Sequence, residues 1–99
     1  MNSANELTLT GSIVERDALR HTPAGIALVN FRVAHESEQR EAGATRQVSA
    51  EVVCLAVEEQ ARLVVAAPLG AAIRVSGFLA AKGRTGRQLV LHVKRIEFE

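Results

Sequence analysis

The sequence predicts an all-β fold, a barrel of five strands with one short helix between the third and fourth strands. Five runs of apolar residues, mostly alternating with polar ones, are separated by turn-forming segments, and one segment has helical spacing instead. Glycines interrupt the first and fourth runs, where a sheet can bend and close on itself. The 99 residues fit one domain over 1–99, and we expect residues 1–5 to be frayed.

The first three strands are predicted from alternation of period two. Residues 6–15 place Leu7, Leu9 and Ile13 against threonine and serine, with Gly11 at a bulge or bend. Residues 16–25 form a loop, and residues 26–35 form the second strand. Residues 36–46 are strongly polar and predict an exposed loop or hairpin tip, before a third strand over 47–55.

Residues 56–67 change period and predict the helix. Val57, Ala61, Val64 and Val65 fall on one helical face, and a proline and a glycine follow as stop signals. Residues 73–81 and 88–98 are the last two strands, joined as a hairpin. The order β-β-β-α-β-β is typical of the OB-fold, whose loops 1–2 and 4–5 and strand faces bind oligonucleotides or oligosaccharides. An open β-sandwich is the structural alternative.

Positive charge is concentrated in the C-terminal part of the chain. The first 59 residues hold nine acidic and five basic residues, and the last 40 hold two acidic and seven basic ones. Lys82, Arg84 and Arg87 lie on the glycine-containing loop between the last two strands. A cationic loop on rigid strands suits a polyanion. A membrane surface or an acidic protein would also fit, and a solvated hairpin tip without a ligand is the simpler alternative.

The chain resembles the primosomal replication protein N (PriB) family, small relatives of bacterial single-stranded DNA-binding proteins. The resemblance runs from about Leu7 to Phe98 and rests on the segments NELTLTGSI, TPAGIALVNFRVAHES, REAG, RQV and IRVSGFLA with LVLHVKRIEF. It implies an OB-fold homodimer that binds single-stranded DNA and bridges the helicase PriA and its loading partner DnaT during replication restart.

The resemblance also implies binding residues. Lys82 and Arg84 match the family's basic loop 4–5 with Arg87 nearby, Arg20 and His21 match basic residues before the TPAG turn, and Arg46 matches an arginine before strand three. The family's pattern has aromatic residues where Ser49 and Ala44 stand and a basic residue where Glu36 stands. These departures predict weaker binding, or binding that depends on charge rather than stacking.

Two further candidates come from the residues themselves. Phe78 is the only aromatic residue near the cationic loop, where a base could stack on it, although a core position explains it at least as well. Lys94 could extend the cationic path or, like Arg74 and Arg95, lie on a solvated strand face, and Arg32 stays open between these roles. Five cations on phosphates, namely Lys82, Arg84, Arg87, Arg20 and Arg46, predict a log–log salt slope of about −3.5.

No catalytic or metal-binding pattern is present in the sequence. Cys54 is the only cysteine, and with His21, His35 and His92 it forms no closely spaced ligand pair. We expect no enzyme activity, no cofactor, no metal and no small-molecule substrate. Without a signal segment or an apolar run of about 20 residues, we expect a cytoplasmic protein with no membrane partner.

The leading hypothesis is a non-catalytic single-stranded DNA-binding accessory protein of the replication-restart primosome. The alternatives are an OB-fold scaffold that binds proteins with little or no nucleic-acid affinity, and an RNA-binding OB protein. Residues 6–15 are the best candidate for a two-fold strand contact in a homodimer. A monomer whose strand edges are masked by Glu6 and Glu15 is the alternative.

Overall fold

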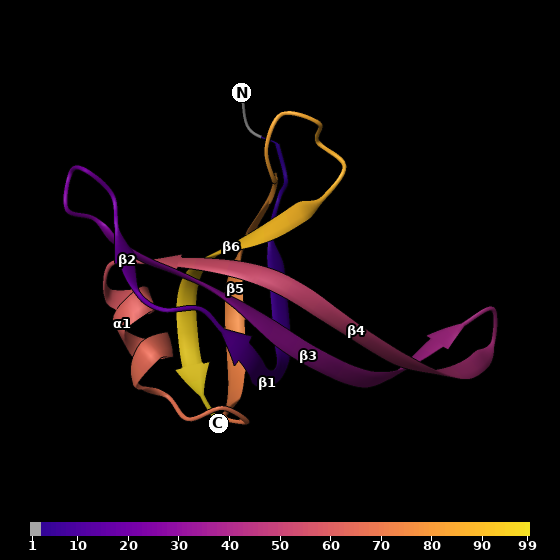
Figure 1. Cartoon of the computed structure of the whole chain (residues 1–99). Coiled ribbons are helices and arrows are strands. Elements are labelled where there is room, and N and C mark those ends of the chain that lie inside the picture. The colour runs from indigo at the N-terminus through magenta and orange to yellow at the C-terminus, as the bar shows by residue number, and fades with distance from the viewer. Residues whose placement is uncertain (1–2) are drawn as a thin grey trace.

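The computed structural model describes residues 3–99 and has one mixed sheet with one short helix (Figure 1). The residues predicted to be frayed include Met1 and Asn2, which lie outside the described residues. The elements are β1 (Leu7–Arg16), β2 (Arg20–His21), β3 (Ala27–Glu41), β4 (Ala44–Val57), α1 (Glu59–Ala66), β5 (Ala72–Ala81) and β6 (Leu89–Phe98).

The sheet closes into a barrel because β1 pairs with strands on both of its sides. Its first half, Leu7–Ser12, runs antiparallel to β5, and its second half, Ser12–Arg16, runs antiparallel to β3. The circuit continues from β5 to β6, from β6 to β4 in parallel, and from β4 to β3. The predicted OB-fold barrel of five strands is confirmed.

One further strand lies in the segment predicted as a loop. β2 is two residues long and pairs only with the start of β3 within the described chain. Because the short β2 is counted as a strand, α1 lies between β4 and β5, which are the third and fourth of the five long strands. The predicted place of the helix in the chain is therefore correct.

Glycines occupy two places where the backbones of neighbouring strands approach closely. A Cβ on Gly11 would lie 2.2 Å from the carbonyl oxygen of Ala34, at the point where β1 passes from β5 to β3. A Cβ on Gly77 would lie 1.8 Å from the carbonyl oxygen of His92, beside a shift in the β5–β6 register. Both predicted glycine bends are therefore positions that no side chain can occupy without a backbone shift.

The β3–β4 hairpin is longer than predicted. Residues 36–46 are strand on both sides of a two-residue turn at Ala42 and Gly43, so the prediction of a loop is wrong and the prediction of an exposed hairpin tip is correct. Both turn residues have positive φ, 51° and 78°, as a type I′ turn requires. Backbone pairing from Leu28–Val57 to Glu41–Ala44 maintains these strands, although their outer part has no apolar alternation. This arm projects from the barrel (Figure 1).

The helix is shorter than predicted. Ala56 and Val57 continue β4 because both still pair with β3, and Val57 is 42% exposed rather than on a buried helical face. Glu58 follows with positive φ. Its backbone N–H donates to the carbonyl oxygen of Ala27, and its side-chain Oε1 accepts a hydrogen bond from the backbone N–H of Ala27. Ala61 and Val64 then bury the inner face of α1 against the barrel, as predicted.

The core fills the barrel interior with aliphatic side chains from every long strand. The fully buried residues include Ile13, Val29, Val33, Val75 and Leu91. On β3, core residues 29, 31 and 33 alternate with residues 28, 30 and 32, which are therefore directed to the outer surface. In residues 3–99, α1 is the only helix, and its eight residues are too few to cross a bilayer.

Candidate nucleic-acid interface

A groove crosses the outer face of β3 and β4 beneath the β5–β6 loop. It consists of two neighbouring hollows of about 210 and 620 Å³, which share Arg32, Val53 and Lys82 in their walls. Asn30 and Phe31 lie in the smaller hollow, and Leu79 and Leu89 lie in the larger one. The alternation on β3 directs Asn30 and Arg32 outward, so both polar groups reach this face.

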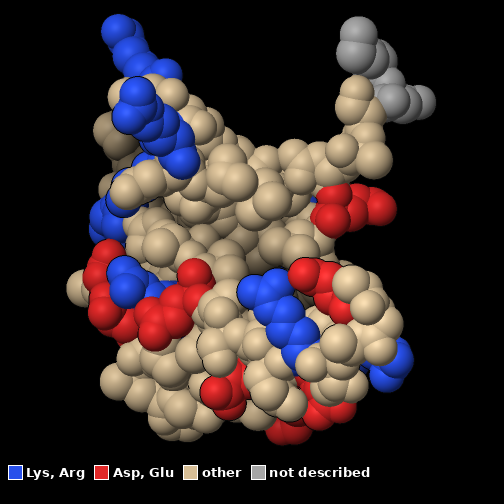
Figure 2. Space-filling model, turned by 90° about the vertical axis from the view of Figure 1, so that its right-hand side faces the viewer, with Lys and Arg blue, Asp and Glu red and all other residues tan. Residues whose placement is uncertain are grey.

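The loop between β5 and β6 carries the three cations that the sequence singled out. Lys82, Arg84 and Arg87 are all exposed, and the backbone N–H of Lys82 donates to the carbonyl oxygen of Gln88 at 2.7 Å, which closes the base of the loop. Within residues 3–99 none of the three side chains has a carboxylate partner within 4.0 Å. Figure 2 shows basic side chains along the upper projection of the molecule, and acidic side chains mixed with further basic ones over the rest of this face.

Arg20 lies next to the smaller hollow of the groove. Its Nη2 donates to Oδ1 of Asn30 at 2.8 Å, and Asn30 lines that hollow. The short β2 strand places Arg20 opposite Leu28 on the outer side of β3. His21 is exposed on the same strand, but it is not among the residues that line the hollow. The structure therefore places Arg20 beside the groove that Lys82 lines, in contact with one of its wall residues.

Arg46 lies apart from that group on the outer part of the β3–β4 arm. Its Nη1 pairs with Oε2 of Glu41 at 3.2 Å, and both side chains are mostly exposed. The arm and the β5–β6 loop project in different directions (Figure 1). A phosphate would have to compete with Glu41 for this guanidinium, although an exposed ion pair is worth only about 0–1 kcal/mol.

Phe78 and Lys94 lie at a different hollow, of about 1020 Å³, beside the N-terminal segment. Of the residues lining the groove, this hollow includes only Leu7. The Phe78 ring is half-buried and meets the His92 ring edge-on, with centroids 5.0 Å apart and an interplanar angle of 85°. From the sequence, Phe78 was either a stacking residue near the loop cations or a core residue, and Lys94 either extended the cationic path or lay on a solvated strand face. The structure places both outside the groove.

Arg32 is the residue that sequence reasoning left open and the structure places centrally. Its guanidinium lines both hollows of the groove, where Nη1 lies 3.4 Å from Oε1 of Glu51. Glu15 and Asp17 line the smaller hollow as well. Arg16 lines it too, so three basic and three acidic residues line the two hollows, and the groove is mixed in charge. Positive charge is in excess only beside the groove, from Arg84 and Arg87 of the loop and from Arg20. The alternation of residues 29, 31 and 33 was the signal that placed Arg32 outside.

Cys54 and the histidines have structural environments. Cys54 is fully buried in the core, and burial raises the pKa of its thiol to about 12, so the reactive thiolate is absent at neutral pH. The Nδ1 of His35 contacts the carbonyl oxygen of Thr10 at 2.7 Å and therefore carries the proton, while Nε2 contacts the Ser37 hydroxyl at 2.8 Å. The described part of the chain contains no cluster of three potential metal ligands.

Comparison with known proteins identifies the family. The chain matches, over residues 5–95, a family model described as another single-strand binding protein family. It is 36% identical over 90 residues to the replication restart protein PriB of Nitrosomonas europaea, covering 91% of this chain and 83% of that protein. The chain belongs to the PriB family.

Solved structures agree with the PriB assignment. The PriB structure from Ralstonia solanacearum has a TM-score of 0.87 and 31% identity, covering 98% of this chain and 100% of that one. A single-stranded DNA-binding protein from Thermus aquaticus, at 22% identity and a TM-score of 0.76, covers 97% of this chain and 50% of its own, and shares the fold. The resemblance seen in the sequence is confirmed. Glu36, Ala44 and Ser49, where the resemblance predicts departures from the family pattern, are all exposed on the β3–β4 arm.

Proposed function

We propose that this protein is a non-catalytic single-stranded DNA-binding accessory factor in replication restart. The observation that carries the proposal is the groove over β3 and β4 with the exposed Lys82, Arg84 and Arg87 above it. This is the position at which OB-folds bind oligonucleotides. The names of the PriB relatives and the single-strand binding family model support the same role.

Charge provides most of the affinity in this proposal. The loop cations and Arg20 contact phosphates and release counterions, which gives binding without base preference. No aromatic residue on the outer face of β3 and β4 lines either hollow within the described chain, since Phe31 belongs to the core. Stacking, worth about 1–3 kcal/mol per base elsewhere, is therefore weak in the groove, and moderate affinity follows.

Charge reversal of the loop tests the proposal. The triple variant Lys82→Glu, Arg84→Glu and Arg87→Glu should lose measurable binding to fluorescent oligo(dT) at low salt, because three phosphate contacts become repulsions. Arg62→Glu on the outer face of α1 is the control and should bind as the parent does. Circular dichroism should show both variants folded. Unchanged binding by the triple variant would end the proposal.

An OB-fold scaffold for proteins is the second candidate, favoured by the acidic residues Glu15, Asp17 and Glu51 in the groove and by Leu89, which is 56% exposed there. The scaffold requires helicase binding that survives high salt, without affinity for oligo(dT).

An RNA-binding role differs in the sugar that is contacted, and competition between matched DNA and RNA oligomers distinguishes it.

We also propose, from the family, contacts with the helicase PriA and with DnaT, and a homodimer formed through β1. Leu7–Gly11 pair only with β5 in the described chain, so one edge of this segment is open to a second copy. Sedimentation should show a dimer at micromolar concentration. A monomer at that concentration would exclude the dimer and leave the groove unaffected.

A further inference from the structure

A β-bulge builds a second surface on the outer side of β5 and β6. Ser76 faces Arg95 and Gly77 faces Val93, so Lys94 is an extra residue in β6 without a partner in β5. The bulge directs two successive side chains, Lys94 and Arg95, to the exposed surface, where an unbulged strand would turn one of them inward. Bulges of this kind re-aim side chains next to binding sites.

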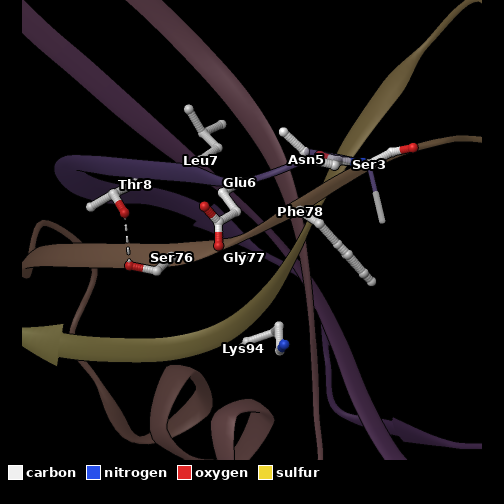
Figure 3. A pocket seen from close by; sticks show the side chains of 10 residues that line it. Ser3, Asn5, Glu6, Leu7, Thr8, Ser76, Gly77, Phe78 and Lys94 are labelled. Atoms are coloured by element: carbon white, nitrogen blue, oxygen red, sulfur yellow. Dashed lines mark hydrogen bonds between the residues drawn. The ribbon is translucent and has the colours of Figure 1, made fainter. Parts of the chain in front are cut away.

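An aromatic ring lies beside the re-aimed lysine. Phe78 is half-buried at the hollow that Lys94 also lines, and His92 holds its ring edge-on at 5.0 Å. Figure 3 shows Phe78 and Lys94 at this hollow, together with Thr8 of β1 and Ser76 of β5, whose hydroxyl groups are hydrogen-bonded. A held ring beside an exposed ammonium group is the combination by which proteins take up single-stranded nucleotides, the ring for a base and the cation for its phosphate.

The β5–β6 loop connects this surface to the proposed groove along the chain. Phe78 precedes Lys82 by four residues on β5, about 13 Å along an extended strand. Among the exposed charges of β5 and β6, Arg74, Lys94 and Arg95 are positive and Glu97 is negative and paired with Arg95 at 3.5 Å. Glu6 is the one acidic residue that lines the hollow. This charge pattern favours a phosphate chain as the occupant.

We propose that a single strand leaving the groove passes over the β5–β6 loop and stacks a base on Phe78, with its phosphate on Lys94. The inference rests on the proposed DNA-binding function and adds a second contact site that only longer strands reach. Oligonucleotides of about six nucleotides occupy the groove alone, and those of about 20, longer than the roughly 4–16 nucleotides that one OB-fold covers, occupy both surfaces.

A tryptophan reporter tests the second site directly. The chain has no tryptophan or tyrosine, so Phe78→Trp introduces a unique fluorophore at the hollow. We expect a 20-nucleotide oligo(dT) to quench its emission and a 6-nucleotide one to bind with little quenching. Phe98→Trp, at the 47% exposed end of β6, is the matched control and should not respond to either. Equal quenching of the two reporters, or none at Phe78→Trp when the long oligonucleotide is bound, would overturn the proposal.

Affinity measurements separate this proposal from the groove itself. Phe78→Leu keeps an apolar side chain and removes the ring, and Lys94→Gln removes the charge. Each substitution should lower the affinity for the 20-nucleotide oligo(dT) by about 5-fold or more. The affinity for the 6-nucleotide oligo(dT) should stay within about 2-fold of the parent's. Equal loss for both lengths, or for neither, contradicts a second site. If the parent binds neither length, the proposed function itself fails.

Discussion

Gly77 is the residue on which the outer surface of β5 and β6 depends. Because Gly77 has no side chain, the carbonyl oxygen of His92 can approach its backbone next to the bulge at Lys94. A Cβ at this position would lie only 1.8 Å from that oxygen. Gly77→Ala should destabilise the fold by about 1–3 kcal/mol because backbone atoms must move apart. Thermal unfolding measures this loss, with Ala72→Ser at an exposed position of the same strand as the control. A melting temperature equal to that of the parent would contradict the close approach.

Single residues also show where reasoning from the sequence succeeds. Gly11 and Gly77 were recognised as bends because a glycine inside an alternating strand has few other purposes. Arg32 was undecided because alternation gives the face of a strand but not what lies opposite, and only the closed barrel brings Lys82 to it. The bulge at Lys94 has no sequence signal, since neither neighbour is a glycine or proline. Grouping Phe78 with the loop cations therefore followed chain distance rather than the face on which each lies.

At the scale of elements, the long strands and the helix were predicted from their apolar periods, and their ends were not. The outer half of the β3–β4 arm is polar on both faces, so no core pattern reveals it, and the backbone ladder and the Ala42–Gly43 turn hold it instead. Val57 fits a helical spacing and a strand spacing equally well. Its pairing with Leu28 in the barrel decides for the strand.

The β3–β4 arm should be dispensable for folding. Between Val33 and Cys54 no residue belongs to the buried core, although Val52 packs against it, and isolated hairpins are marginally stable at best. Replacing residues 38–47 by Asn-Gly, which joins the paired Ser37 and Val48, should therefore cost no more than about 1 kcal/mol in a denaturant titration. Val33→Ala, at a fully buried position, is the control and should cost about 2 kcal/mol. A larger loss from the truncation would show that the arm supports the barrel.

For the whole molecule, the distribution of charge matters more than the net charge of +1. Arg46, Arg62 and Arg95 are paired with neighbouring glutamates, whereas the three loop cations have no such partner in the described chain. The three loop cations and Arg20 together give about four phosphate contacts for a short strand in the groove. The expected log–log salt slope is therefore about −2.8. The barrel thus works as a nearly neutral body whose β5–β6 loop presents three cations without carboxylate partners.

The salt slope tests this picture of the molecule through a short oligo(dT) titrated at several salt concentrations. Lys82→Gln should make the slope shallower by about 0.7, since one phosphate contact is lost. Arg62→Gln removes a cation on α1 that is paired with Glu58 and does not line the groove, so it should leave the slope unchanged. A slope near zero with measurable affinity would mean that uncharged contacts hold the strand. In that case the groove of mixed charge, with Arg32 paired to Glu51, would bind the strand, and the β5–β6 loop would not contribute to the affinity.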